Sequence, residues 1–143
     1  MVDMRLEVVI LPVSDVDRAK AFYEQAGFVL DVDHQPNDEF RVVQFTPPGS
    51  DCSITFGIGL GEEPASPLKG VHLCVADIEE AVAELSKRGV ETDPIRHMGP
   101  NGWQAGADPE HRKYNSYSAF SDPDGNGWIL QEVGGGTSRE ERH

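Results

Sequence analysis

Two stretches of the chain decide the fold: LPVSDVDRAKAFYEQAGFVLD at residues 11–31 and LCVADIEEAVAELSKRGVETD at residues 73–93. They align without a gap at an offset of 62 residues, and Leu, Val, Asp, Ala and Gly recur at matching places. Self-similarity at one constant offset is the signature of a repeated structural unit. The sequence therefore predicts two copies of one unit.

Each copy begins with a strand that leads into a helix. Residues 7–11 and 71–75 are mostly apolar and contain β-branched side chains, which is typical of strands. A side-chain oxygen that can cap a helix follows each strand, from Ser14 or Asp15 in the first copy and from Asp77 in the second. Apolar residues then recur at helical spacing until a glycine, which favours a helix end.

Short strands follow each predicted helix. They are expected at residues 28–34, 39–46 and 52–58 in the first half, and at residues 90–95, 117–121 and 128–133 in the second. The predicted fold class is α+β, with two tandem βαβββ modules. We expect a single domain over residues 1–133, with modules at 4–58 and 70–133, a linker at 59–69, a long irregular loop at 96–116 and a flexible tail at 134–143.

The composition of the 143 residues excludes several classes of partner. Twelve basic and 25 acidic residues give a formal charge of −13, which repels nucleic acids and anionic membranes. The acid surplus would suit a cationic ligand. No apolar run reaches the roughly 20 residues that span a bilayer, and the N-terminus lacks a signal-peptide pattern. Cys52 and Cys74 are expected to be buried free thiols, so the predicted location is cytoplasmic.

The repeated unit resembles the vicinal oxygen chelate superfamily, which includes glyoxalase I, the bleomycin-resistance proteins, the fosfomycin-resistance enzymes and the extradiol dioxygenases. The resemblance is carried by LPVSD at 11–15 leading into AFY at 21–23, by Gly27-Phe28, and by DPDGN at 122–126. It implies that the two modules form a cup-shaped mixed β-sheet, with a pocket at or near a dimer interface, and hence a homodimer.

In that superfamily four inward positions commonly hold a divalent metal, with a His early on the first strand of each module and a carboxylate on the last. The resemblance places these positions at residues that are poor ligands: Val8, Gly70, the vicinity of Ile129, and Ser53 or Thr55. We therefore predict no metal and no other cofactor. The alternative is a divalent metal held by displaced ligands.

Strand alternation indicates which polar side chains face the cup. His72 and Gln131 have the inward parity, whereas Glu132 points away. With Gln44 and Thr55 they form a constellation that has one imidazole and no carboxylate. Such a set suits a small-molecule pocket better than a metal centre.

Each of these residues also has a structural interpretation. His72 is either a core histidine or a catalytic acid/base or ligand donor. Gln44 and Gln131 either orient a ligand or satisfy backbone groups. Trp103, in the loop that also holds Tyr114, either plugs the core or covers a ligand. Trp128 on the last strand is expected in the core or at a dimer contact.

The favoured function is binding of a small organic molecule in the cup, of the bleomycin-resistance kind. Its ligand-binding residues would be Gln44, Thr55, His72, Trp103, Tyr114 and Gln131. The alternative is an enzyme of the same superfamily: a lyase or isomerase with His72 as catalytic residue, or a dioxygenase with displaced metal ligands. The DPDGNG segment at 122–127 begins like a calcium loop, but position 12 falls on Val133, so a turn is predicted.

Overall fold

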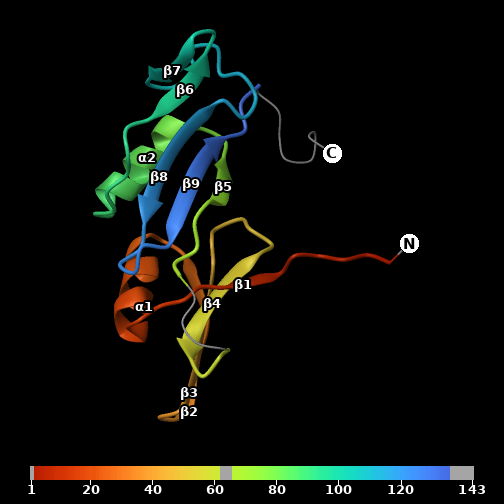
Figure 1. The fold of residues 1–143 in the computed structure, drawn as a ribbon, viewed down its shortest axis with the longest axis vertical. Helices are drawn as coiled ribbons and strands as arrows, with labels where there is room; N and C mark the ends of the chain where they lie inside the picture. The colour runs from red at the N-terminus through yellow and green to blue at the C-terminus, as the bar shows by residue number, and fades with distance from the viewer. Residues whose placement is uncertain (1, 62–65, 136–143) are drawn as a thin grey trace. The chain divides into compact units, whose positions relative to one another are not determined.

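The computed structural model describes residues 2–61 and 66–135, and the chain forms two compact units (Figure 1). Unit 1 consists of Met1–Leu68 together with Asp122–Asn126, and unit 2 of Lys69–Ser121 with Gly127–His143. In the ranges described, neither helix has the length or apolar character needed to cross a bilayer.

Unit 1 contains one helix and one mixed sheet. Its elements are β1 (Val8–Ile10), α1 (Val16–Gln25), β2 (Val29–Asn37), β3 (Phe40–Thr46) and β4 (Ser53–Ile58). The strand order is β1-β4-β3-β2, in which β1 runs parallel to β4 and the other pairs are antiparallel.

Unit 2 repeats this plan with an added hairpin. Its elements are β5 (Val71–Val75), α2 (Ile78–Lys87), β6 (Arg96–Gly99), β7 (Gly102–Ala105), β8 (Ser116–Ser121) and β9 (Gly127–Glu132). The order is β5-β9-β8-β6-β7, and again the first strand runs parallel to the last. The mixed α+β fold class is confirmed.

The two helices begin in the same way, which confirms the repeat. Asp15 and Asp77 are the N-caps, with extended backbones at φ −139° and −137°. Each carboxylate accepts a hydrogen bond of 3.0 Å from the amide three residues later. Gly27 and Gly89 follow the two helices at φ 92° and 83°, a conformation that disfavours a side chain.

Each unit has its own aromatic core. In unit 1, Tyr23 of α1 packs against Phe45 and Phe56, at centroid distances of 6.0 and 5.8 Å. In unit 2, Phe120 and Trp128 stack with an interplanar angle of 8°. Trp128 is therefore a core residue, one of the two roles expected for it.

Two expectations for residues 90–116 are wrong. Residues 90–95 form no strand, because Pro94 has no amide to donate to a ladder. Residues 96–116 are not irregular throughout, since β6 and β7 form a hairpin whose outer strand pairs Arg96 with Ala105. Only residues 106–115 connect it to β8 without helix or strand.

Other expectations have mixed outcomes. Both cysteines are free, as expected, but neither is buried: Cys52 is half-buried and Cys74 is exposed. Cys74 is exposed because it lies on the same strand face as the exposed His72. Residues 122–126 form the predicted turn. The tail beyond residue 135 and linker residues 62–65 lie outside the described ranges, and the single-domain division stays a prediction.

Candidate functional site

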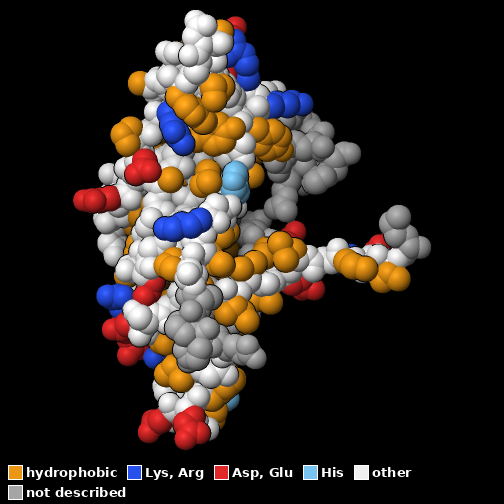
Figure 2. Space-filling view, in the orientation of Figure 1, with side chains coloured by type: hydrophobic (Ala, Val, Ile, Leu, Met, Phe, Trp, Pro, Cys, Tyr) orange, Lys and Arg blue, Asp and Glu red, His pale blue; other side chains and the backbone are white. Residues whose placement is uncertain are grey.

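Unit 2 contains a cavity of about 300 Å³ on one face of its sheet. Its walls come from β5, the segment before β6, the β6–β7 hairpin, β8 and β9. The lining residues are His72, Asp93, Pro94, Arg96, Trp103, Tyr117, Ser118, Ala119 and Ile129. In Figure 2, apolar side chains gather over this sheet beside basic side chains and a histidine.

Strand alternation separates the cavity face from the core face. Tyr117 and Ile129 are half-exposed, whereas their neighbours Trp128 and Leu130 are buried. Glu132 shares the core parity, and its carboxylate accepts a hydrogen bond of 2.9 Å from the amide of Ile78 at the start of α2. Glu132 therefore points away from the cavity, as its parity indicates.

A chain of hydrogen bonds joins the polar groups at one side of the cavity. The Nδ1 atom of His72 lies 3.0 Å from Oε1 of Gln131. The Nε2 atom of Gln131 donates to the carbonyl oxygen of Tyr114 at 3.1 Å and to the hydroxyl of Tyr117 at 3.3 Å. The Tyr117 hydroxyl itself donates to the Tyr114 carbonyl at 2.7 Å. His72 is exposed, so the core interpretation of this residue is wrong.

The hairpin supplies the aromatic wall. Trp103 of β7 meets Tyr117 edge to face at a centroid distance of 5.4 Å, and the guanidinium of Arg96 lies 4.1 Å from the Trp103 ring centroid. The Trp103 side chain nevertheless stays 47% exposed, so it does not plug the core. Arg96 and Asp93 give the lining one charge of each sign, so the overall acidity of the chain does not set the charge of the cavity.

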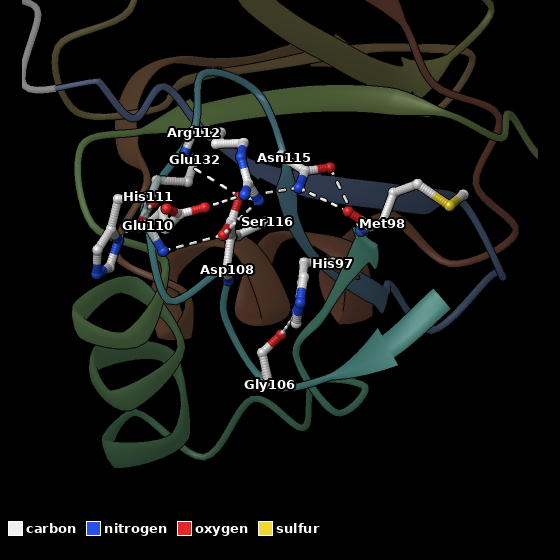
Figure 3. A network of polar contacts seen from close by, with 10 residues as sticks. All are labelled: His97, Met98, Gly106, Asp108, Glu110, His111, Arg112, Asn115, Ser116 and Glu132. Carbon is white, nitrogen blue, oxygen red and sulfur yellow. Dashed lines mark hydrogen bonds and ion pairs between the residues drawn. The ribbon is translucent and has the colours of Figure 1, made fainter. Parts of the chain in front are cut away.

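The segment between β7 and β8 is ordered by a buried carboxylate, Asp108 (Figure 3). It accepts hydrogen bonds from the side chains of Arg112 and Asn115, and its own amide donates to Ser116. The bond from Asn115, helped by Arg112, lowers the pKa of Asp108. Asp108 is not among the residues predicted from the sequence, although an Asp before a proline is a signal for a turn.

The same segment is anchored to β9 on the opposite face from Gln131. His111 Nδ1 lies 3.0 Å from Glu132 Oε1, and this contact raises the pKa of His111. Both His111 and Tyr114 adopt left-handed backbones, at φ 48° and 55°. Such conformations are costly for residues other than glycine and persist where surrounding contacts impose them.

The six predicted ligand-binding residues divide between the units. His72 and Trp103 line the cavity of unit 2, and Gln131 and Tyr114 bond to lining residues. Gln44 and Thr55 lie in unit 1, where they are paired across β3 and β4. Neither is part of the lining of this cavity, and the binding role of all six stays a prediction.

The donor set does not fit the superfamily's usual metal. Val8 pairs with Ser53 on β4, and Gly70 precedes β5, so these positions offer at most a hydroxyl oxygen. Ile129, opposite His72, is a hydrocarbon. Within residues 2–61 and 66–135, no three His, Cys, Asp or Glu side chains are grouped so that they could hold a metal ion.

Comparisons with known proteins agree with this architecture. The chain is similar to TnmS3, an antibiotic binding protein from Streptomyces sp. CB03234, with 34% identity, a TM-score of 0.67, and coverage of 93% of this chain and 98% of that one. A glyoxalase/bleomycin resistance protein from the same organism is also 34% identical, with a TM-score of 0.63 and coverage of 89% and 99%.

A third solved structure, a superfamily member from Sphaerobacter thermophilus DSM 20745, is 30% identical with a TM-score of 0.65, over 91% of this chain and 98% of that one. No curated protein matches the chain. The family model for the Glyoxalase/Bleomycin resistance protein/Dioxygenase superfamily matches residues 5–130. The chain therefore belongs to the Glyoxalase/Bleomycin resistance protein/Dioxygenase superfamily.

Proposed function

We propose that the protein binds a small organic molecule with an aromatic ring in the cavity of unit 2, and that it does so without a metal. The observation that carries this proposal is the half-exposed Trp103, which borders a cavity of about 300 Å³ beside Tyr117. A large aromatic side chain is rarely left open to water unless a partner covers it.

The dimensions and chemistry of the cavity support a drug-sized or smaller ligand. Its volume lies at the lower end of the range typical of ligand pockets, and its walls combine aromatic rings with a few polar groups. The similarity to TnmS3, described as an antibiotic binding protein, points to the same class of ligand.

The contacts of His72 favour binding over acid/base catalysis. A catalytic histidine is commonly oriented by a carboxylate that stabilises the imidazolium. Here the amide of Gln131 takes that place and carries no charge. The lyase or isomerase alternative lacks this support, and the dioxygenase alternative needs a metal that the aligned residues do not fit.

Binding is tested with 2-naphthol as an aromatic probe, followed by chemical-shift titration. Trp103→Ala should weaken binding about tenfold or more, because the ring contact is lost, whereas Trp103→Phe should retain part of it. Phe40→Ala removes an exposed aromatic residue of unit 1 and is the matched control. Equal affinities in wild type and Trp103→Ala would overturn the assignment of the site.

Whether the protein binds its ligand without a metal is tested by a separate measurement. The protein is purified without a chelator or a histidine tag, and its divalent metals are quantified by elemental mass spectrometry. We expect a content well below one ion per chain, and unchanged probe binding after treatment with EDTA. One stoichiometric ion per chain would overturn the metal-free proposal.

The proposal includes a homodimer, supported by apolar side chains at both edges of the unit 1 sheet. Val8 and Ile10 on β1, and Leu30 and Val32 on β2, are exposed. Exposed apolar edge strands favour association with another chain. Light scattering should give twice the chain mass, and Ile10→Lys or Leu30→Lys should reduce it. A wild-type monomer at all concentrations would contradict this.

A cytoplasmic location also remains a proposal. Its support is that Cys52 and Cys74 are free thiols, with Cys74 exposed, which suits a reducing compartment. Cell fractionation with an antibody to the protein tests it, and recovery of the protein outside the cytoplasm would overturn it.

A further inference from the structure

The orientation of the Gln131 side chain is determined by a backbone carbonyl. The carbonyl oxygen of Tyr114 can only accept hydrogen bonds, so the group that lies 3.1 Å from it must be the NH₂ of Gln131. The second hydrogen of that NH₂ points to the Tyr117 hydroxyl at 3.3 Å. The Tyr117 hydroxyl donates its own hydrogen to Tyr114. Both donors of the amide are therefore used.

This orientation determines the tautomer of His72. With the NH₂ of Gln131 committed, its oxygen Oε1 faces His72 Nδ1 at 3.0 Å. An amide oxygen accepts, so Nδ1 must carry the hydrogen. In a neutral imidazole the lone pair then lies on Nε2. Within the described part of the chain, Nε2 makes no hydrogen bond, and His72 lines the cavity.

We infer that His72 is a specificity-determining residue, and that it selects aromatic ligands with a hydrogen-bond donor, such as a phenolic hydroxyl. This rests on the proposed function, since it names the ligand class of the same cavity. Asp93 also lines the cavity, and an ionised carboxylate can only accept hydrogen bonds, so Asp93 favours ligands with a donor as well. Arg96 supplies donors, but its guanidinium lies over the Trp103 ring.

The tautomer is measured first, on the ligand-free protein. Long-range ¹H–¹⁵N correlation spectra at about pH 8.5, where an ordinary imidazole is neutral, should show His72 with a protonated Nδ1 and a lone pair on Nε2. His97 is the internal positive control, because its Nδ1 lies 2.8 Å from the carbonyl oxygen of Gly106 and must donate as well. Exposed His34 serves as the reference for an unconstrained ring.

Substitution of Gln131 tests the cause. Gln131→Met removes the acceptor and should return His72 toward the tautomer mixture of His34, while His97 stays unchanged. A protonated Nε2 at His72 in the wild type, or a tautomer that is unchanged in Gln131→Met, would overturn the inference whatever the ligand is.

Selectivity is then measured with two related probes, 2-naphthol and 2-methoxynaphthalene, in which a methyl group replaces the donor hydrogen. In the wild type the naphthol should bind roughly three- to tenfold more tightly, the value of one partly exposed hydrogen bond. His72→Phe should lower this ratio toward one, whereas Trp103→Ala should weaken both probes and preserve it.

The outcomes separate the two proposals. If both probes bind wild type equally while His72 has the expected tautomer, the donor requirement is wrong and the aromatic site stands. If His72→Phe leaves the ratio intact, selectivity comes from another residue and the inference fails. If neither probe binds, the aromatic-ligand proposal itself is overturned, and the donor requirement with it.

Discussion

The carboxylate of Glu132 accepts a hydrogen bond of 2.9 Å from the amide of Ile78, which places a buried negative charge at the first residue of α2. Only 2% of the Glu132 side chain is exposed, and its other oxygen lies 3.0 Å from His111. This residue stabilises α2 because an anion at a helix N-terminus interacts favourably with the unsatisfied amides there. It also anchors the segment that precedes β8.

Glu132→Gln should lower the free energy of unfolding by about 1–2 kcal/mol, because the charge at the helix start is lost while an acceptor remains. Glu84→Gln is the control, since Glu84 forms an exposed ion pair with Arg88 and should change stability by less than about 0.5 kcal/mol. Urea unfolding measures both. Equal effects would contradict the role assigned to Glu132.

The contact between His111 and Glu132 should make stability depend on pH. The hydrogen bond and charge of Glu132, with smaller effects from Asp77 and Glu79, raise the pKa of His111 above 6.5. Its stabilising contribution is therefore complete below pH 6.5 and declines as the pH rises through the raised pKa. His111→Asn, which tolerates the left-handed backbone, should remove this dependence. If the difference in stability between the wild type and His111→Asn is the same at every pH, the prediction is contradicted.

In unit 1 an ion-pair network should govern unfolding in acid. Hydrogen bonds from Arg41 and then Lys20 lower the pKa of Asp33 from 3.8 to about 2. A lowered pKa contributes stability above pH 3.8 that is lost as the pH falls toward 2. Asp33→Asn should lower the free energy of unfolding by about 1–2 kcal/mol at neutral pH, allowing for partial exposure. The variant should also lose less stability than the wild type as the pH falls toward 2. Asp38→Asn, in the exposed turn between β2 and β3, should leave this loss of stability in acid unchanged.

Asp108 should hold the segment before β8 in one conformation. Asp108→Ala removes the acceptor shared by Arg112 and Asn115, so amides at residues 108–116 should exchange hydrogen faster. Exchange in β9 should stay slow, because its ladder with β5 is intact. Lys113→Ala, at an exposed position of the same segment, is the control. Unchanged exchange in Asp108→Ala would show that other contacts order the segment.

Much of the fold could be predicted from the sequence because its signals are local. Asp15 and Asp77 cap helices through amides three residues away, and their backbones match closely. The turn at residues 122–126 follows from its own Asp, Pro and Gly content. Strand parity, which needs only the alternation of neighbours, placed His72 and Gln131 on one face and Glu132 on the other.

The site was predicted only in part, because its walls depend on contacts between residues distant in sequence. Trp103 reaches Tyr117 because β6 pairs with both β7 and β8, and Arg96 pairs with Tyr117 across 20 intervening residues. Residues 96–105 have no alternating pattern that would have predicted the hairpin. The role of Asp108 likewise arises from partners that only the folded segment assembles.

The sequence by itself therefore determined the repeat, the helix starts and the parity of the cavity strands. Only the tertiary structure decided which polar groups meet, and with them the hydrogen-bond roles of Gln131 and His72. The physical reason is that a side-chain amide can turn either its oxygen or its NH₂ toward a partner, and a neutral imidazole can carry its hydrogen on either nitrogen. Its role is determined by the backbone carbonyl of Tyr114, which strand pairing brings within 3.1 Å of Gln131.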